Sequence, residues 1–307
     1  MRAAASAAAR FSQETKGPKL KRIIAIVALF ALLPAQLLGW SAKGHAIIAD
    51  IASARLTPGA RKNLNVLLGN NSLASIANWA DAIRNDQPET FGWHFVDIPR
   101  NAEGFAEERD CYRPQDKGPT ALTDHHNCIV DRIAMFRQVL SDENASERDR
   151  LIALMFLVHF VGDVHQPLHA IEDARGGNDV KVTVFGSDQC GNYPCNLHGA
   201  WDYSLVEHTG YSEQEYVHHL QGLIRKNHWE QKAGGSAEDW ADESHRGALQ
   251  VWMNDGAVID ERYYQANIHL VNERLALAGL RLAALLNDTL GRIPTKQFKE
   301  SLERRGR

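Results

Sequence analysis

The chain has 307 residues, 44% of them hydrophobic and 23% charged, with a formal net charge of −4. These values are typical of a globular protein with one large domain and one substantial core. The acidic balance argues against binding of a polyanion by a broad basic surface, which needs many Lys and Arg contacts to phosphate.

Residues 1–39 have the pattern of a secretory signal peptide. Basic residues at positions 19, 21 and 22 precede an apolar run, residues 23–33, that is too short to span a bilayer. We therefore expect cleavage before Trp40 and a secreted or periplasmic protein, with an uncleaved membrane anchor as the alternative. Cleavage would leave 28 Lys+Arg and 37 Asp+Glu, a formal charge of −9. If such a chain acts on nucleic acid, bound divalent cations must attract the phosphate.

From Trp40 onward the apolar pattern is mostly helical. It predicts helices at about residues 45–56, 58–68, 72–85, 120–140, 147–166 and 257–287. Thr57-Pro58 and Ser146-x-x-Asp149 are typical helix starts.

Two stretches favour short strands. Trp93 to Ile98 is aromatic, and Val180 to Phe185 alternates after a Gly-Gly turn. The sequence thus predicts a mainly α fold, with a single compact helical domain at residues 40–290 and a short β-hairpin. Residues 291–307 are expected to form a charged C-terminal tail that frays.

The four cysteines are predicted to form two disulfides in an exported chain. Cys190 and Cys195 enclose the turn-rich sequence Gly-Asn-Tyr-Pro, and Cys111 and Cys128 bracket a polar segment that contains Pro and Gly. We expect these two pairs. A zinc-thiolate site is the alternative, although no Cys-x-x-Cys spacing occurs.

One stretch, residues 157–169, has the spacing of a metal site. His159 and Asp163 stand four residues apart, so they lie on one face of a helix and can bind the same ion. Pro167 turns the chain just beyond them, which would present His169 to a neighbouring ion.

A second pair, His198 and Asp202, repeats this spacing on another segment. Imidazole nitrogen with carboxylate oxygen is a ligand set that suits zinc. Hydrogen bonds on a helix surface would explain either pair alone, but two such pairs in one chain favour metal binding.

The sequence resembles the S1/P1 nuclease family over nearly all of the chain from Trp40. Six motifs occur in the family's order: Trp40 to His45, Trp79 to Arg84, Trp93 to Asp97, His159 to His169, Gly176 to Asn178 and Asn196 to Asp202. The resemblance implies the phospholipase C/P1 nuclease fold and zinc-dependent cleavage of the 3′-O–P bonds of single-stranded DNA and RNA. The products would carry 5′-phosphates, and 3′-nucleotidase activity is a further expectation. We expect a monomer without a stable protein partner.

The resemblance also implies three Zn²⁺ ions. Asp81, His94 and His159 would hold the first, and Asp163 would bridge it to the second. The free α-amino nitrogen and carbonyl oxygen of Trp40, together with His45, would complete the second ion, so signal cleavage would complete the site. His169, His198 and Asp202 would hold the third. His165 matches no ligand of the family and is expected to have a supporting role.

The same resemblance assigns residues to the substrate. Arg84 would clamp the phosphate oxygens, and Asp81 would hold both metal and Arg84. Phe95 would stack on an unpaired base, which favours single strands, and Asp97 would bind its edge. Plain core packing is the alternative role of Phe95.

Two further residues would line the base pocket. Asn178 matches a family residue that helps to hold the base. Arg175 occupies a wall of the pocket that is often apolar in the family, although a guanidinium can also stack.

Two other functions stay open at this point. Zinc-dependent phospholipase C also has an N-terminal Trp and a three-metal site, but it usually has Glu at the position of Asp202 and lacks the Phe95/Asp97 pocket. A non-catalytic secreted metal-binding protein is the other alternative, although structural zinc sites are usually rich in Cys.

Overall fold

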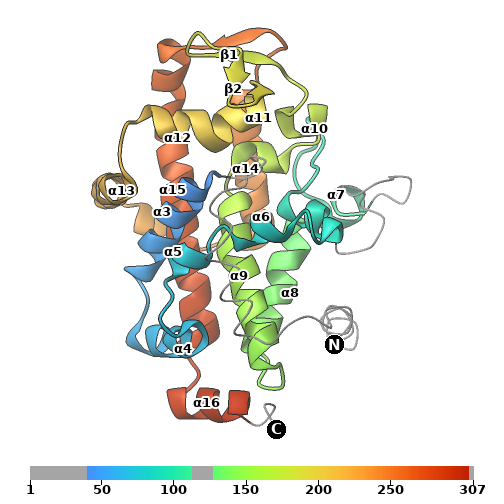
Figure 1. The fold of residues 1–307 in the computed structure, drawn as a ribbon. Helices are drawn as coiled ribbons and strands as arrows, with labels where there is room; N and C mark the ends of the chain where they lie inside the picture. The colour runs from blue at the N-terminus through green and yellow to red at the C-terminus, as the bar shows by residue number, and fades with distance from the viewer. Residues whose placement is uncertain (1–39, 113–126, 304–307) are drawn as a thin grey trace.

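The computed structural model describes residues 40–112 and 127–303, and within them the fold is mainly α, as the sequence predicts (Figure 1). The helices of the first half are α3 (Ala42–Ser53), α4 (Pro58–Leu68), α5 (Leu73–Ile76), α6 (Trp79–Ile83), α7 (Glu107–Asp110), α8 (Ile129–Ser141) and α9 (Glu147–Asp163). Those of the second half are α10 (Ala174–Gly177), α11 (Leu197–Gly199), α12 (Leu205–His208), α13 (Glu213–Asn227), α14 (Ala237–Val251), α15 (Glu261–Leu290) and α16 (Thr295–Glu303). Short 3₁₀ helices lie at η1 (Pro88–His94), η2 (Pro167–Ala170) and η4 (Trp229–Lys232), and a π-helical turn lies at η3 (Ala200–Ser204).

Helix α9 forms the centre of the core. Every residue from Ala153 to Asp163 is buried, because α8, α3 and α15 pack around it. A helix that is apolar on all faces is stable only in such an interior position. Its start is the one predicted, since the Ser146 side chain accepts a hydrogen bond from the Asp149 N–H. In Figure 1, α15 runs along most of the length of the molecule beside this core.

The predicted helix at residues 72–85 is two short helices, α5 and α6, separated at Ala77 and Asn78. In an unbroken helix the Ala77 carbonyl would accept the N–H of Asp81. Instead it accepts a hydrogen bond from Nδ1 of His159, at 2.8 Å. The helix break therefore provides a support for a side chain of α9.

The strands are short and lie near one end of the molecule (Figure 1). Strand β1 (Val182–Val184) lies inside the predicted stretch, but its partner is the distant β4 (Ala257–Ile259), in parallel register. The predicted hairpin is formed by β2 (Gln189–Cys190) and β3 (Tyr193–Pro194). Because β4 occupies residues 257–259, helix α15 begins only at Glu261, later than the sequence pattern suggests.

The strand prediction for Trp93 to Ile98 is wrong. The turn η1 continues to His94, and the residues after it are extended but have no strand partner among the described residues. Their backbone bonds go elsewhere: the Val96 N–H donates to the His169 carbonyl at 2.9 Å, and the Phe95 carbonyl accepts from the Ile129 N–H. The aromatic pattern reflects burial between η2 and α8, and not a sheet.

Both cysteine pairs are joined as expected, Cys111 to Cys128 and Cys190 to Cys195. No thiol in either pair is therefore left to bind a metal, which removes the zinc-thiolate alternative. The predicted helix at residues 120–140 is represented by α8, and its first part, residues 120–126, lies outside the described residues.

The C-terminal residues that we described as a charged tail include helix α16. Its Phe298 is fully buried, and the Arg150 guanidinium lies 5.0 Å from the centre of that ring. Charged side chains cover the other face of α16, and for this reason the composition of residues 291–307 is similar to that of an unstructured tail. Among residues 40–112 and 127–303, no helix is both long and apolar enough to cross a membrane.

Candidate metal centre

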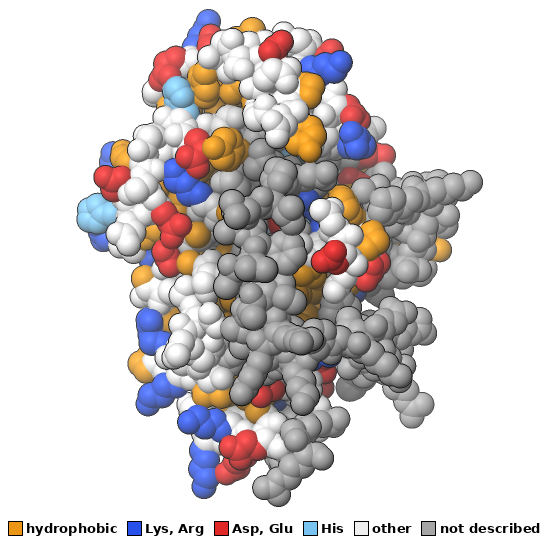
Figure 2. All heavy atoms as spheres, in the orientation of Figure 1, with side chains coloured by type: hydrophobic (Ala, Val, Ile, Leu, Met, Phe, Trp, Pro, Cys, Tyr) orange, Lys and Arg blue, Asp and Glu red, His pale blue; other side chains and the backbone are white. Residues whose placement is uncertain are grey.

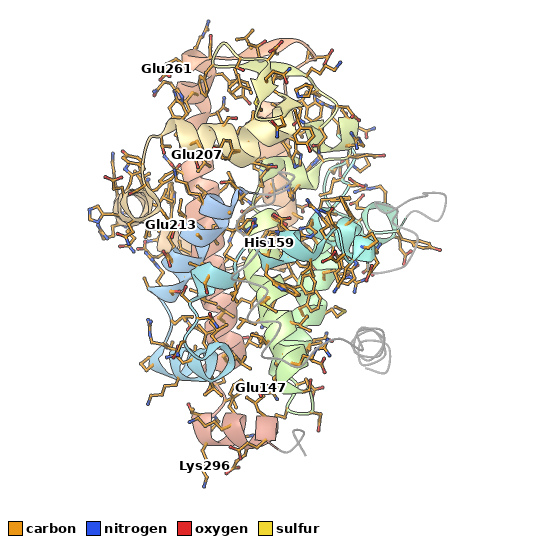
Figure 3. All side chains as sticks on the ribbon, in the orientation of Figure 1. Glu147, His159, Glu207, Glu213, Glu261 and Lys296 are labelled. Atoms are coloured by element: carbon orange, nitrogen blue, oxygen red, sulfur yellow. A yellow bond between two sulfur atoms is a disulfide. The ribbon has the colours of Figure 1, made fainter. Side chains whose placement is uncertain are left out.

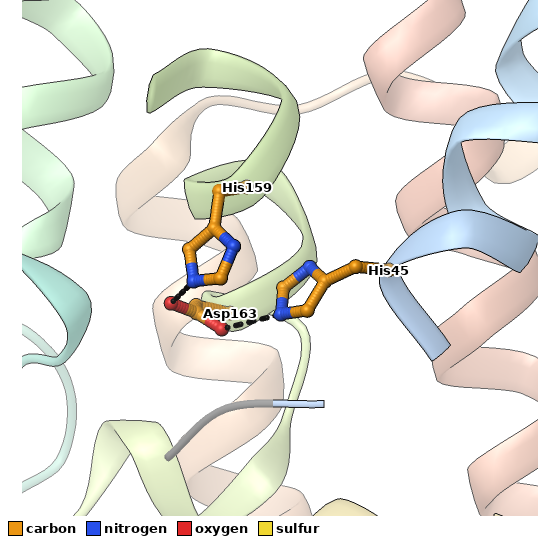
Figure 4. Close-up of side chains that lie close together, drawn as sticks. All are labelled: His45, His159 and Asp163. Atoms are coloured by element: carbon orange, nitrogen blue, oxygen red, sulfur yellow. Dashed lines mark ion pairs between the residues drawn. The ribbon is translucent and has the colours of Figure 1, made fainter. Parts of the chain in front are cut away.

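The last two turns of α9 bring two predicted ligands together. His159 and Asp163 are fully buried and lie one helical turn apart, with 3.0 Å between Nε2 of His159 and Oδ2 of Asp163. His45 of α3 faces them, and its Nε2 lies 3.2 Å from Oδ1 of Asp163 (Figure 4). The rings of His45 and His159 are stacked, with their centroids 3.9 Å apart. In Figure 3, His159 lies well inside the molecule, between its two ends.

Glycines make this close approach possible. A Cβ atom on Gly162 would lie 2.7 Å from Nδ1 of His45, so any other residue there would force the His45 ring or α3 to shift. On the other side, a Cβ on Gly44 would lie 2.9 Å from the Cβ of Trp40. The fully buried Trp40 is thereby held close to the turn that carries His45.

Two more predicted ligands complete this group. His94, at the end of η1, places Nδ1 2.9 Å from Oδ2 of Asp163 and 3.8 Å from Oδ1 of Asp81. That Asp81 oxygen also lies 3.5 Å from Nε2 of His159. The chain thus gathers two carboxylates and three imidazoles, which come from α3, α6, η1 and α9.

A second group consists of His169, His198 and Asp202. Nε2 of His198 is 3.2 Å from Nε2 of His169 and 3.3 Å from Oδ2 of Asp202. Nε2 of His169 is 3.9 Å from Oδ1 of Asp202. All three side chains are buried. They are carried by η2, α11 and the π-helical turn η3.

Backbone carbonyls fix the orientation of these rings. Nδ1 of His169 donates to the His94 carbonyl and Nδ1 of His198 donates to the Gly176 carbonyl, each at 2.7 Å. As for His159, the Nε2 atom is left with its lone pair toward the neighbouring ligands, which is the usual arrangement of metal-binding histidines. Gly176 has φ +63, and a Cβ there would lie 2.5 Å from the Leu168 carbonyl oxygen. The Gly-Gly-Asn motif therefore places the Gly176 carbonyl that orients the His198 ring.

Burial and charge set the protonation of the first group. Burial lowers the pKa of His94 to about 4. Burial would also lower that of His159, but Asp163 and Asp81 outweigh it and raise this pKa to about 10. Burial opposes ionisation of Asp163, yet His159 and other imidazoles hold its pKa well below the usual value. Two buried carboxylates therefore require a proton on His159 or a cation in its place.

The donor atoms fit a metal cluster. Oδ1 of Asp81, Oδ1 of Asp163 and Nε2 of His45 and His159 are buried without a hydrogen bond of good geometry. Such unsatisfied atoms cost about 1–3 kcal/mol each. Bound cations would explain four such atoms close together, because each atom could then donate a lone pair to a metal ion. Imidazole nitrogen with carboxylate oxygen is a ligand set typical of zinc.

Arg84 lies at the edge of the first group. Its Nη1 is 3.3 Å from Oδ1 of Asp81, and its guanidinium lies 4.7 Å from the centre of the Phe91 ring. The side chain is only 4% exposed. A guanidinium held by an acid and an aromatic face keeps a fixed direction beside the cluster.

The predicted base-binding residues are less closely grouped. Phe95 and Asp97 are half-buried and lie on the extended segment after η1. Arg175 is exposed, and its guanidinium makes two bonds to Asp179 on its own segment, at 2.9 and 2.6 Å. The Asn178 amide donates to the Arg175 carbonyl at 2.8 Å. In this arrangement Arg175 is engaged by Asp179.

Sequence reasoning missed one contact of the second group. The Gln166 amide donates to Oδ1 of Asp202 at 2.5 Å, and its carbonyl oxygen accepts the Leu168 N–H. The only sequence signal is its place between the ligands Asp163 and His169.

The fold and the buried His/Asp groups define a helical protein with a candidate multi-metal centre. A family model described as S1/P1 Nuclease matches residues 40–291. Nuclease P1 of Penicillium citrinum is 30% identical over 283 residues, which cover 82% of this chain and 98% of that protein. Endonuclease 2 of Arabidopsis thaliana is 29% identical over 305 residues, covering 90% and 99%. Nuclease S1 of Aspergillus oryzae is 27% identical over 299 residues, covering 87% and 98%.

The chain belongs to the S1/P1 nuclease family. It is therefore a phosphodiesterase that acts on nucleic acids, as the sequence motifs predict.

Proposed function

We propose that this protein is a secreted, zinc-dependent endonuclease that hydrolyses the 3′-O–P bonds of single-stranded DNA and RNA and leaves 5′-phosphorylated products. A 3′-nucleotidase activity on mononucleotides is part of the proposal. The observation that carries it is the convergence of two carboxylates and three imidazoles at distances of 2.9–3.8 Å, in a chain of the S1/P1 nuclease family.

We assign three zinc ions to the donor atoms. Asp81, His94 and His159 would hold the first ion, with Asp163 shared between it and the second. His45 and the backbone of Trp40 would complete the second ion. The third would bind to the separate group, which consists of His169, His198 and Asp202.

Zinc bound at these residues would lower the pKa of a water molecule and offset negative charge on the phosphate. The protein side chains have distinct tasks around that chemistry. Arg84 binds a phosphate oxygen and stabilises the charge that develops in the transition state. Asp81 keeps the Arg84 guanidinium in place at 3.3 Å. Phe95 stacks on the base and Asp97 accepts a hydrogen bond from it, which requires an unpaired base.

The base pocket has a polar outer wall in this proposal. Arg175 would have to leave Asp179 before stacking on a base, while Asn178 supports the backbone of the same turn. We therefore expect weak base preference.

Charge supports the role of bound cations. On the face drawn in Figure 2, basic and acidic side chains of the described residues are interspersed, and these residues form no broad basic patch there. A mature chain of net charge −9 would repel a polyanion at long range. Attraction of phosphate would then come from the ions and from Arg84.

Export and a monomeric state complete the proposal. Two disulfides are typical of an oxidising compartment, which fits the signal-like residues 1–39.

The test is a nuclease assay on protein that begins at Trp40. Single-stranded and double-stranded DNA, and RNA, are incubated with the protein before and after treatment with EDTA, and the product ends are identified. We expect release of 5′-phosphorylated nucleotides from single strands, loss of activity in EDTA, and recovery with zinc. Protein that binds zinc but leaves all nucleic acids intact would contradict the proposal, and phosphatidylcholine would then be the next substrate to assay.

A variant separates phosphate binding from metal binding. Arg84→Ala should lower kcat/KM by about a hundredfold or more while the zinc content is unchanged. Loss of zinc in this variant would show instead that Arg84 serves to hold Asp81.

A further inference from the structure

The segment of residues 164–170 connects the two ligand groups. It starts directly after Asp163, at the end of α9, and it carries His169 in η2. Asp163 is fixed by the regular hydrogen bonds of α9. Within the segment the backbone has short-range turn bonds, such as those from the Gln166 N–H to the Asp163 carbonyl and from the His169 N–H to the Gln166 carbonyl. A longer backbone bond is accepted by the His169 carbonyl from the Val96 N–H. The place of His169 therefore depends on contacts from outside the segment.

The chain around the end of η1 provides two of these contacts, from Val96 and from the His94 carbonyl, which accepts from Nδ1 of His169. Side chains of α14 and α15 provide others. Three of them hold carbonyl groups of the segment. Ser244 Oγ donates to the Val164 carbonyl at 2.5 Å, and Nδ1 of His245 donates to the Ala170 carbonyl at 2.9 Å. From α15, Nε of Arg274 donates to the carbonyl of His165 at 3.0 Å.

The side chain of His165 is held as well. Its Nε2 lies 2.9 Å from Nη1 of Arg281, and because a guanidinium has no acceptor, His165 must accept this hydrogen bond. Its Nδ1 therefore carries the proton and donates to the Val161 carbonyl at 2.7 Å. This arrangement fixes both the tautomer and the direction of the ring.

One carboxylate holds both arginines. Glu243 accepts from Nη1 of Arg274 at 2.7 Å and from Nη1 and Nη2 of Arg281 at 2.6 and 2.8 Å. The two arginine side chains are only 4% and 3% exposed, whereas Glu243 is 31% exposed. Without that charge, two adjacent buried guanidinium groups would repel each other and move from the segment.

We propose that Glu243, Arg274 and Arg281 are positioning residues that set His169 relative to Asp163 and thereby the affinity of the group formed by His169, His198 and Asp202 for zinc. This inference rests on the proposed function, because it concerns the third ion of that site. None of the three residues contacts the ligand atoms themselves. Their effect passes through the backbone of residues 164–170 and through Gln166, which contacts Asp202.

The test measures zinc binding to the full mature protein with a competing chelator. The variants are Glu243→Gln and, in case that change alters folding, Arg281→Lys, which keeps the positive charge but loses the two-bond geometry. We expect about a 10- to 100-fold weaker affinity for one of three zinc ions, with the other two unchanged. Circular dichroism confirms that each variant is folded. Glu238→Gln is the matched control, since Glu238 lies on the same helix as Glu243, α14, and its side chain is exposed.

A double-variant comparison identifies the affected ion. His198→Ala removes a ligand of the third ion, so adding Glu243→Gln to it should cause no further change in zinc binding. Equal weakening of all ions, or three ions bound to Glu243→Gln and Arg281→Lys as tightly as to the wild type, would overturn the positioning role. A wild-type protein that binds no zinc would instead contradict the proposed function itself.

Discussion

Asp163 lies close to three other predicted ligands of the first group. Its two oxygens lie 2.9–3.2 Å from nitrogens of His45, His94 and His159. Asp163→Asn keeps the shape but removes the charge that attracts the cations. We expect the variant to lose zinc from the paired ions and to lose activity by at least about a hundredfold. Zinc content by atomic absorption and the nuclease rate are measured together, and full turnover with normal zinc content would refute this role.

Close packing at Gly162 gives a prediction about stability and metal binding. In Gly162→Ala the new Cβ would lie 2.7 Å from Nδ1 of His45, so α3 or the ring must shift. We expect a loss of about 1–3 kcal/mol in the free energy of unfolding and weaker zinc binding.

Gly222→Ala in α13 is its control. Apart from the backbone of its own helix and its chain neighbours, no atom lies within 4 Å of the added Cβ there, so this change should be neutral or stabilise by up to about 1 kcal/mol. Urea denaturation measures both variants. If Gly162→Ala and Gly222→Ala had the same free energy of unfolding, the structure around Gly162 and His45 would accommodate the added Cβ without loss of stability.

Local spacing explains which residues of the candidate site could be grouped from the sequence. His159 with Asp163, and His198 with Asp202, each lie one helical turn apart, so a single helix brings them together. Asp81 and His94 come from distant elements, and only the resemblance to a family linked them to the cluster. No local pattern links His165 to Arg281, because 116 residues separate them.

At the level of elements, helices rich in apolar residues were predictable and irregular segments were not. Helices α4 and α9 start where Thr57 and Ser146 predict. The segment after His94 has the composition of a strand, yet it is bound on one side by η2 and on the other by α8. Helices α13 and α14 were not predicted individually, because their outer faces are rich in charged residues.

The link between α14 and α15 predicts a pH dependence of stability. Burial would raise the pKa of Glu243, but hydrogen bonds from Arg281 and charge from Arg274 outweigh it and lower it from 4.5 to about 2. A lowered folded-state pKa contributes stability above pH 4.5, and this contribution is lost as the pH falls from 4.5 toward 2. The stability difference between wild type and Glu243→Gln should therefore be largest near neutral pH and shrink through this window. Urea denaturation of EDTA-treated protein at several pH values measures it, and a constant difference would contradict the prediction.

At the scale of the whole molecule, the predicted signal cleavage site lies next to the candidate metal centre, at Trp40. The residue is fully buried, and the N–H of the next residue, Ser41, donates to the Asp202 carbonyl at 2.8 Å. Trp40 is therefore anchored beside Asp202 of the second ligand group and close to the turn that carries His45. A change at Trp40 is therefore expected to affect both ligand groups, although Trp40 is remote in sequence from α9.

Cleavage before Trp40 should therefore complete one of the proposed zinc sites. An α-amine offers a lone pair to zinc near neutral pH, whereas a peptide nitrogen does not. Protein that begins at Trp40 should bind one more zinc ion than protein with two added residues, Gly-Ser, before Trp40, and its activity should be at least about tenfold higher. Gly-Ser added after Arg307 is the control and should have no effect. Equal zinc content and rate in the two N-terminal forms would show that His45 and Asp163 hold their ion without the amine, and export would then have no part in completing the site.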